Sequence, residues 1–261
     1  MAELATIQPG ATPFRIEDNV NSTWYGVVRL RDKTMLNAVI KDVGPKEMAS
    51  ELIASTILHA LGLRTPKVYL AYARADIFFA EKGPRVAGGR VVLAFERKGD
   101  PPLGQNWKAT FFPPTVFERI FQNSNFGGTF AFDTWVANID RHIFNLLLSD
   151  DGGIHLIDHG HCFGGPSWSI ESLVPSADYP NRMAHWLLRR LDRKQHKTFS
   201  EAILVLSKLA DKVDLDSAAA DAAAEAFLTD AEFQAMIRFL NERRIGLIPL
   251  ATKQAGAPKL L

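Results

Sequence analysis

The feature that most constrains the fold is one change of pattern along this chain of 261 residues. Up to about residue 102 the apolar residues form strand-like runs, with a single stretch at helical spacing. From residue 103 onward helical spacing dominates and is interrupted once. This order predicts an α+β protein, β-rich first and mainly helical afterwards. Such a layout favours a cleft between the two parts, where ligands commonly bind.

The first part predicts a small sheet and one helix. Aromatic and β-branched residues, which favour strands, are concentrated in runs 24–30, 38–41, 68–73 and 91–95. The helix begins after Gly44, where Pro45 stands near the first helical position and its missing N–H costs little. Gly62 stands where a left-handed C-terminal cap belongs, so the helix is expected to end there.

The second part predicts several helices. Apolar periodicity indicates helices over 115–122 and 128–138, and the alanine-rich residues 217–227 favour another. Two sets of residues have capping-box spacing before apolar runs: Thr198 with Glu201, and Thr229 with Glu232. The predicted division is a flexible leader (1–13), an N-terminal lobe (14–102), a C-terminal lobe (103–250) and a flexible tail (251–261).

Composition excludes several classes of protein. Apolar residues make up 47% of the chain, which argues against a wholly disordered protein. Thirty basic and 29 acidic residues give a net charge of +1, so direct nucleic-acid binding is not expected. Cys162 is the only cysteine, and this fits a reducing compartment. No run of 18 apolar residues and no secretory signal pattern occur, so we expect no membrane span and a cytoplasmic location.

The residues that carry chemistry lie around one predicted hairpin. Asp140 and Asn145 are separated by four residues, and two apolar runs flanking a turn at 150–153 then lead to Asp158. In kinases an Asp at this spacing accepts the proton of the nucleophile and the Asn holds Mg²⁺. A hairpin would return the chain so that Asp158 supplies a second oxygen ligand. The alternative is a polar turn whose Asp and Asn only bond to the backbone.

An upstream lysine completes this pattern. Lys41 ends the strand 38–41, which has the form of the kinase strand whose lysine contacts ATP phosphates and pairs with a helix glutamate. Glu51 lies ten residues on, inside the predicted helix. Glu47 competes for the same role, but it lies in the first turn, where the helix dipole alone explains a carboxylate. The alternative for Lys41 is a solvated lysine at the end of a strand.

These residues resemble the HipA-like kinases, particularly their short stand-alone branch. The similarity covers roughly residues 20–165 and rests on segments 38–41, 51–66, 132–145 and 156–160. It implies a bilobal protein-kinase-like fold, with a small β-rich N-lobe containing one helix and a larger, mainly helical C-lobe containing a catalytic β-hairpin. The Asp-Arg-His motif and the later Ile-Asp-x-Gly-His also resemble phosphatidylinositol 3- and 4-kinases.

The resemblance implies a role for each matching residue, with ATP and Mg²⁺ as cofactors. Lys41 would contact phosphate and Glu51 would orient it, Asp140 would be the base, and Asn145 and Asp158 would bind metal. A hinge over residues 93–96 would hold adenine through the backbone, which assigns nucleotide contacts to Ala94, Phe95 and Glu96. Two departures are the lack of a glycine-rich loop near the first strand and His159 in place of the usual aromatic residue.

Three functions remain open on this basis. The first is transfer of the γ-phosphoryl group to a serine or threonine of a protein, with an antitoxin-like partner as a further implication of the resemblance. The second is a kinase for a lipid head group or another small alcohol. The third is an inactive ATP-binding scaffold.

Other residue groups carry weaker signals: His142, His155, His159 and His161 for zinc, Cys162 for a reactive thiol, and the basic residues within 189–197 for docking.

Overall fold

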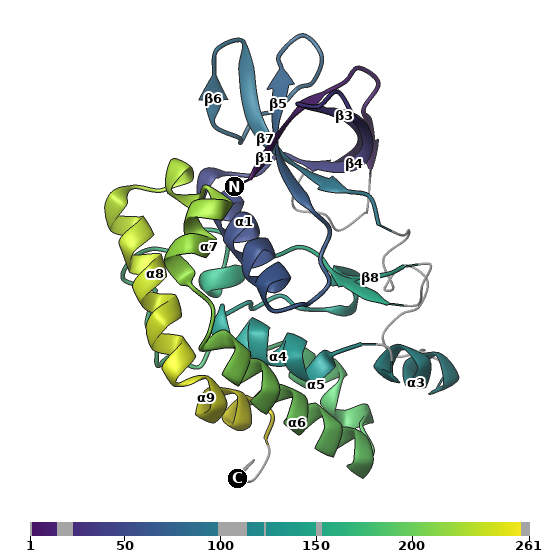
Figure 1. The fold of residues 1–261 in the computed structure, drawn as a ribbon, viewed down its shortest axis with the longest axis vertical. Coiled ribbons are helices and arrows are strands. Elements are labelled where there is room, and N and C mark those ends of the chain that lie inside the picture. The colour runs from purple at the N-terminus through teal and green to yellow at the C-terminus, as the bar shows by residue number, and fades with distance from the viewer. Residues whose placement is uncertain (1, 15–22, 99–113, 123, 150–152, 257–261) are drawn as a thin grey trace.

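The computed structural model describes residues 2–14, 23–98, 114–122, 124–149 and 153–256 (Figure 1). The boundary expected near residues 99–102 lies outside these ranges. The sheet of the first part has the strand order β1-β5-β7-β4-β3-β2, with β6 beside β7. Its strands are β1 Glu3–Ile7, β2 Thr12–Phe14, β3 Thr23–Leu30, β4 Met35–Lys41, β5 Val68–Arg74, β6 Arg85–Val86 and β7 Gly89–Glu96. The four strands predicted from composition are thus confirmed as β3, β4, β5 and β7.

Much of the leader expected over residues 1–13 is instead part of the sheet, as strands β1 and β2. Strand β1 pairs in parallel with β5 and antiparallel with β3, so five strands close on themselves as a barrel. The alternation along β1 explains its role, because Ala5 and Ile7 point into the barrel core while Leu4 stays exposed. No short-range signal marks this pairing, since both partner strands are distant in sequence.

Helix α1 (Pro45–Ala60) begins and ends as predicted. Gly44 is its N-cap, Pro45 follows at the first position, and Gly62 has a positive φ of 70°. The helix is buried on most of its circumference, including Met48, Leu52 and Ile57. These side chains share one core with the C-terminal helices, whereas the barrel has a separate core. Figure 1 shows α1 leaving the barrel and running beside α7.

This arrangement corrects the predicted fold class. The bilobal protein-kinase-like fold, with one helix inside a small N-lobe, is wrong. The structure has a closed five-stranded barrel followed by helices, a mixed α+β fold, and α1 packs with those helices. The physical reason lies in α1 itself: a helix that is apolar on most faces must be covered on most faces, and one side of a small sheet cannot cover it.

The helices after the barrel follow the predicted pattern with local differences. They are α3 Pro114–Gln122, α4 Phe126–Trp135, α5 Met183–Trp186, α6 Arg193–Ala210, α7 Leu215–Ala222, α8 Asp230–Ile245 and α9 Leu247–Gln254. The capping box of Thr229 and Glu232 is confirmed at the start of α8. The box predicted at Thr198 is wrong, because α6 already begins after Asp192, which forms a capping box with Gln195.

Two further expectations for the second part are modified. The single helix expected over 217–227 is divided at Ala223, whose φ of 52° is left-handed, into α7 and a 3₁₀ turn, Ala224–Phe227. The tail expected from residue 251 is helical as far as Gln254. Among the described residues, none of the helices combines the length and the apolar character needed to cross a membrane.

Candidate functional site

A lysine between two carboxylates forms the centre of the candidate site. Lys41, the last residue of β4, places its Nζ 3.0 Å from Asp158 Oδ1 and 3.4 Å from Glu51 Oε1. The Lys41 side chain is 13% exposed and that of Asp158 is 35% exposed, whereas Glu51 is fully buried. Strand β4, helix α1 and the segment after the hairpin each contribute one of these groups. The structure therefore brings together three predicted residues that are far apart in sequence.

The charges of this cluster stabilise one another. Burial acts to raise the pKa of Asp158, but the Lys41 ammonium outweighs it and lowers that pKa to about 2. Burial acts to lower the pKa of Lys41, and the charges of Asp158 and Glu51 raise it instead. For Glu51 burial dominates and raises the pKa. At neutral pH the exposed edge of the cluster is therefore an ammonium beside an ionised carboxylate.

Glu51 rather than Glu47 connects the lysine to the segment that follows the hairpin. Besides its contact with Lys41, Glu51 accepts a hydrogen bond from the backbone N–H of His159 at 2.9 Å. Glu47 packs against Gly160, where a Cβ would lie 2.6 Å from the Glu47 Cγ, so a larger residue there would have to displace the Glu47 side chain. Burial and then the charge of Glu51 raise the pKa of Glu47 to about 7. Glu51 thus has the geometry expected of the orienting residue.

The candidate base, Asp140, is held on both carboxylate oxygens. Arg182 Nη1 lies 2.5 Å from Asp140 Oδ1, and His142 Nε2 lies 3.5 Å from Oδ2. His142 Nδ1 accepts the N–H of Phe144, so its other nitrogen can carry the proton toward Asp140. Burial acts to raise the pKa of Asp140, but the bond from His142 and nearby positive charges lower it. Asp140 therefore stays ionised and keeps one orientation.

Asn145 is placed beside Asp158 by the hairpin, which the structure confirms. Strands β8 (Leu146–Leu148) and β9 (Ile154–Leu156) pair antiparallel, and the N–H of Ile157 then donates to the carbonyl of Asn145 at 3.1 Å. Asn145 Nδ2 donates to the carbonyl of Asp140 at 2.8 Å. This bond fixes the amide with its nitrogen toward Asp140, which leaves the amide oxygen as the group available to a ligand.

The residues present fit Mg²⁺ bound together with a nucleotide. Mg²⁺ is commonly held by one or two protein oxygens, substrate phosphates and water, and it needs no complete protein cage. Asp158 supplies an ionised carboxylate and Asn145 supplies an amide oxygen. Within the described ranges, no three or more His, Cys, Asp or Glu side chains are grouped so as to hold a metal ion. Asp158 and Asn145 are therefore candidate ligands for a metal that arrives with phosphates.

Two residues that the sequence analysis did not single out hold the loop together. Arg141 and Asp133 are fully buried, with Nε 3.0 Å from Oδ2 and Nη2 3.2 Å from Oδ1. Arg141 also donates to the carbonyls of Asn145 and Ile157. Asp133 is the single charged residue of the apolar helix α4, and that isolation is the signal that could have identified it.

The predicted adenine hinge lies inside the barrel sheet. Ala94 and Phe95 of β7 are paired with β4 on one side and with β5 on the other. A backbone contact with adenine at these residues would therefore have to replace a strand pairing. The ring of Phe95 instead lies 5.3 Å from the Lys41 ammonium, so this residue reaches the cluster through its side chain. Glu96, the last residue of β7, pairs with Lys98.

Two of the residues with weaker sequence signals, Cys162 and His159, have structural explanations. Cys162 is buried, and burial raises the pKa of its thiol, which fits an unreactive cysteine. His159 is buried as well; burial and the charge of Arg141 lower its pKa well below the usual value. Arg141 Nη2 contacts its Nδ1 at 3.0 Å. His159 therefore serves to pack and connect the site.

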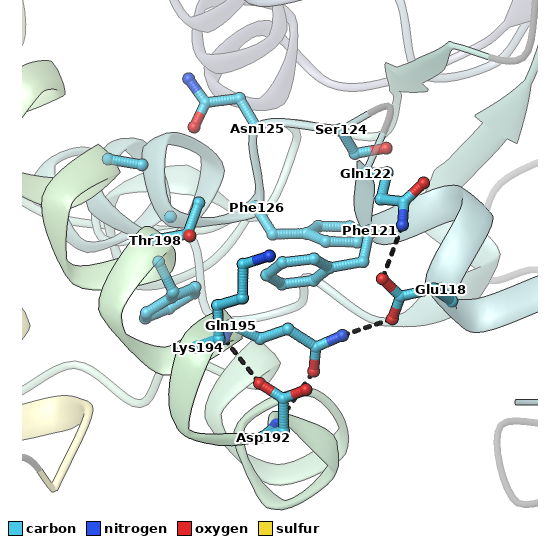
Figure 2. A pocket seen from close by; sticks show the side chains of 13 residues that line it. Glu118, Phe121, Gln122, Ser124, Asn125, Phe126, Asp192, Lys194, Gln195 and Thr198 are labelled. Atoms are coloured by element: carbon cyan, nitrogen blue, oxygen red, sulfur yellow. Dashed lines mark hydrogen bonds between the residues drawn. The ribbon is translucent and has the colours of Figure 1, made fainter.

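A separate cavity of about 380 Å³ lies between α3, the start of α4 and the start of α6 (Figure 2). Figure 2 shows the rings of Phe121 and Phe126 among the lining side chains, with the end of the Lys194 side chain beside them in this view. Gln195 Nε2 donates to Glu118 Oε2 at its edge. None of the predicted catalytic or metal-binding residues lines this cavity.

Comparison with known proteins leaves the family open. No family model and no curated protein matches the chain. The chain is similar to a solved structure described as "Structure of the open conformation of CtTel1", with 12% sequence identity and a TM-score of 0.45. The similarity covers 95% of this chain and 11% of the other, so the chain spans about a tenth of that protein's length. A similarity of this degree carries no conclusion about activity.

Proposed function

We propose that this protein is an ATP- and Mg²⁺-dependent phosphotransferase that transfers the γ-phosphoryl group to a serine or threonine hydroxyl of a protein. The observation that carries the proposal is the position of the Lys41 ammonium between Glu51 and Asp158. A buried cluster of this kind, open on one side, concentrates a cation and an ionised carboxylate where a metal-bound polyphosphate needs both.

Each residue of the cluster has a distinct task in this proposal. Lys41 binds phosphate oxygens, and Glu51 keeps its ammonium at the mouth of the site. Asp158 and Asn145 hold Mg²⁺. The metal, when bound, neutralises the charge that develops on the phosphate oxygens. Because Lys41 and Asp158 contact each other at 3.0 Å, nucleotide and metal would compete with this ion pair for the same two groups.

Asp140 is the proposed base of the transfer. The acceptor oxygen forms a bond to the γ-phosphorus as the bond to the β–γ bridging oxygen breaks. The hydroxyl proton passes to Asp140, and ADP leaves with the electron pair of the broken bond. His142 and the backbone N–H of Asp140, which donates to Asn138 Oδ1 at 3.0 Å, keep the carboxylate in place.

The choice of a protein acceptor rests on the sequence resemblance to HipA-like kinases, and membership of that family is part of the proposal. The site chemistry also suits a lipid or small-alcohol acceptor, since in-line transfer needs the same positioning, metal and base. A scaffold that only binds ATP has no chemical need for an oriented base beside two metal ligands, and this argues for an enzyme.

The test is incubation with γ-labelled ATP, Mg²⁺ and a cell extract, followed by identification of the labelled product. We expect labelled protein, and labelled lipid would instead indicate the second acceptor class. Asp140→Asn keeps the shape of the side chain and removes its charge, so kcat should fall by about 10²–10⁴-fold. The melting temperature and the affinity for ATP should stay near wild type. Transfer at the wild-type rate would show that Asp140 is not the base.

Binding of the metal is tested independently of turnover. Calorimetric titration of ATP into wild type should show much tighter binding with Mg²⁺ than without it. Asp158→Asn should lose most of that difference because an amide is a weaker ligand than a carboxylate. Asp178→Asn is a matched control, since Asp178 is an exposed carboxylate paired with Lys253. Equal affinities under all conditions would contradict the metal assignment.

A further inference from the structure

An exposed arginine is held beside the candidate base by two attachments of its segment. Arg182 immediately precedes α5, and its neighbour Asn181 is buried. Asn181 Nδ2 donates to the carbonyl of Phe130 at 3.0 Å and to Thr134 Oγ1 at 3.1 Å, both on α4. Its Oδ1 accepts the N–H of Met183 at 3.1 Å. The backbone on either side of Arg182 is therefore fixed to the helix that precedes the catalytic loop.

The other end of α5 is attached to the catalytic loop itself. Trp186 Nε1 donates to the carbonyl of Arg141 at 3.1 Å, and its indole packs edge-on against Phe126. Arg141 adjoins Asp140 in sequence, so α5 and the candidate base are held as one unit. This rigidity places the Arg182 side chain next to Asp140 in a defined geometry.

The Arg182 side chain remains accessible despite its ion pair. Its Nη1 lies 2.5 Å from Asp140 Oδ1, and the side chain is 56% exposed. Surface ion pairs with this exposure contribute little to folding, so stability alone does not account for so firmly held an arginine. A guanidinium carries five N–H donors in a planar fork that matches phosphate oxygens, and one contact with Asp140 leaves others for a ligand.

We propose that Arg182 is a further catalytic residue, whose guanidinium binds the phosphoryl oxygens during transfer while it holds Asp140 toward the acceptor hydroxyl. This inference rests on the proposed function. A base must lie about 2.6–3.2 Å from the hydroxyl it deprotonates, and that oxygen faces the γ-phosphorus. A cation in contact with the base therefore reaches the same phosphoryl group. Lys41 supplies positive charge on the leaving-group side, and Arg182 supplies it on the acceptor side.

The test compares Arg182→Gln and Arg182→Lys with Arg189→Gln, an exposed arginine on the same segment that serves as the matched control. Arg182→Gln should lower kcat by about 10²–10³-fold, as loss of a transition-state donor does. Arg182→Lys should recover part of this loss, because it keeps the charge without the fork. In both Arg182 variants, KM for ATP and the melting temperature should stay near wild type. The Arg189→Gln variant should be near wild type in kcat as well.

A binding measurement separates this role from a structural one. Calorimetry with ADP, Mg²⁺ and aluminium fluoride, a mimic of the transferring phosphoryl group, should show at least tenfold weaker binding in Arg182→Gln. Binding of ADP and Mg²⁺ alone should be unchanged. Addition of guanidinium ions at millimolar concentration should restore part of the rate of Arg182→Ala.

Three outcomes would overturn the inference. Faster transfer by Arg182→Gln would show that the contact of Arg182 with Asp140 inhibits the reaction. An unchanged rate together with unchanged binding of the mimic would show that Arg182 and Asp140 are a surface ion pair without a role in transfer. Equal weakening of ADP and of the mimic would indicate general ground-state binding. These three outcomes are measured against an active wild type. A wild type that neither transfers phosphate nor binds ATP would refute the proposed function itself, and with it the role of Arg182.

Discussion

Two buried ion clusters lie next to each other in this molecule and differ in one respect. In the cluster of Arg141 and Asp133 both side chains are fully buried, and the guanidinium also bonds to two backbone carbonyls and to His159. In the cluster of Lys41, Glu51 and Asp158 one ammonium serves two carboxylates, and Asp158 is 35% exposed. The first cluster is closed and the second is open to a ligand.

The difference separates residues that maintain the fold from residues that are available for chemistry. Arg141 has its donors distributed among protein acceptors, so a ligand would have to displace bonds that hold the loop of Asp140. Lys41 and Asp158 meet at the exposed edge of the candidate site, where their contact can be exchanged for contacts with a ligand. A buried charge thus indicates a functional site when its bonding is incomplete, and a structural one when its bonding is saturated.

The largest expected effect is on stability, at the closed cluster. Arg141→Met should lower the free energy of unfolding by about 3–5 kcal/mol, because Asp133 and two carbonyls are left buried without their donor. Lys41→Met should lower the free energy of unfolding by less than half as much. Asp158 is partly hydrated, and Glu51, whose pKa is raised, can take up a proton when the lysine is lost. Urea unfolding of both variants at pH 7 makes the comparison. Equal losses would mean that the open cluster is also structural.

The second largest effect is a dependence of the free energy of unfolding on pH, and it comes from Glu47, which borders the open cluster. The pKa of Glu47 is raised to about 7 in the folded protein, so this group stabilises the fold below its unfolded pKa, and the contribution is lost as pH rises toward 7. Glu47→Gln removes this titration. The free energy of unfolding of wild type minus that of the variant should therefore fall by roughly 2–3 kcal/mol between pH 4.5 and 7.5. A difference that is constant with pH would show that Glu47 ionises normally.

The smallest expected effect is the coupling inside the open cluster. Lys41→Met and Glu51→Gln should each lower kcat/KM, and the double variant should be little worse than the poorer single one. The interaction energy should be about 1–3 kcal/mol, because each residue acts through their shared contact. Additive losses would mean that Glu51 does not orient Lys41. The pair Lys41→Met and Glu47→Gln provides the control cycle.

The cluster could be predicted from sequence because each member carries a local signal. Lys41 ends an apolar strand, Glu51 lies inside the predicted helix, and the hairpin returns the chain from Asn145 to Asp158. The structure brings Lys41, Glu51 and Asp158 together, and their catalytic roles remain predictions. Arg182 could not be predicted, since an exposed arginine 42 residues beyond Asp140 carries no pattern that connects the two. The assignment of the Ala94 and Phe95 backbone to adenine rests on the resemblance alone and stays a prediction; in the structure both residues are paired with strands on both sides.

The sequence by itself determined many of the local elements: strands β3, β4, β5 and β7, the caps of α1 and α8, the hairpin and the order of the chemistry-bearing residues. Periodicity, caps and turns depend on residues close together in the chain, so a short segment is sufficient to specify them. Only the tertiary structure decided that β1 closes the barrel, that α1 belongs to the helical core, and that Arg141 and Arg182 meet Asp133 and Asp140. Except for Arg141 and Asp133, which are eight residues apart, these contacts join distant segments, and their stability depends on which surfaces remain to be covered once every local element has formed.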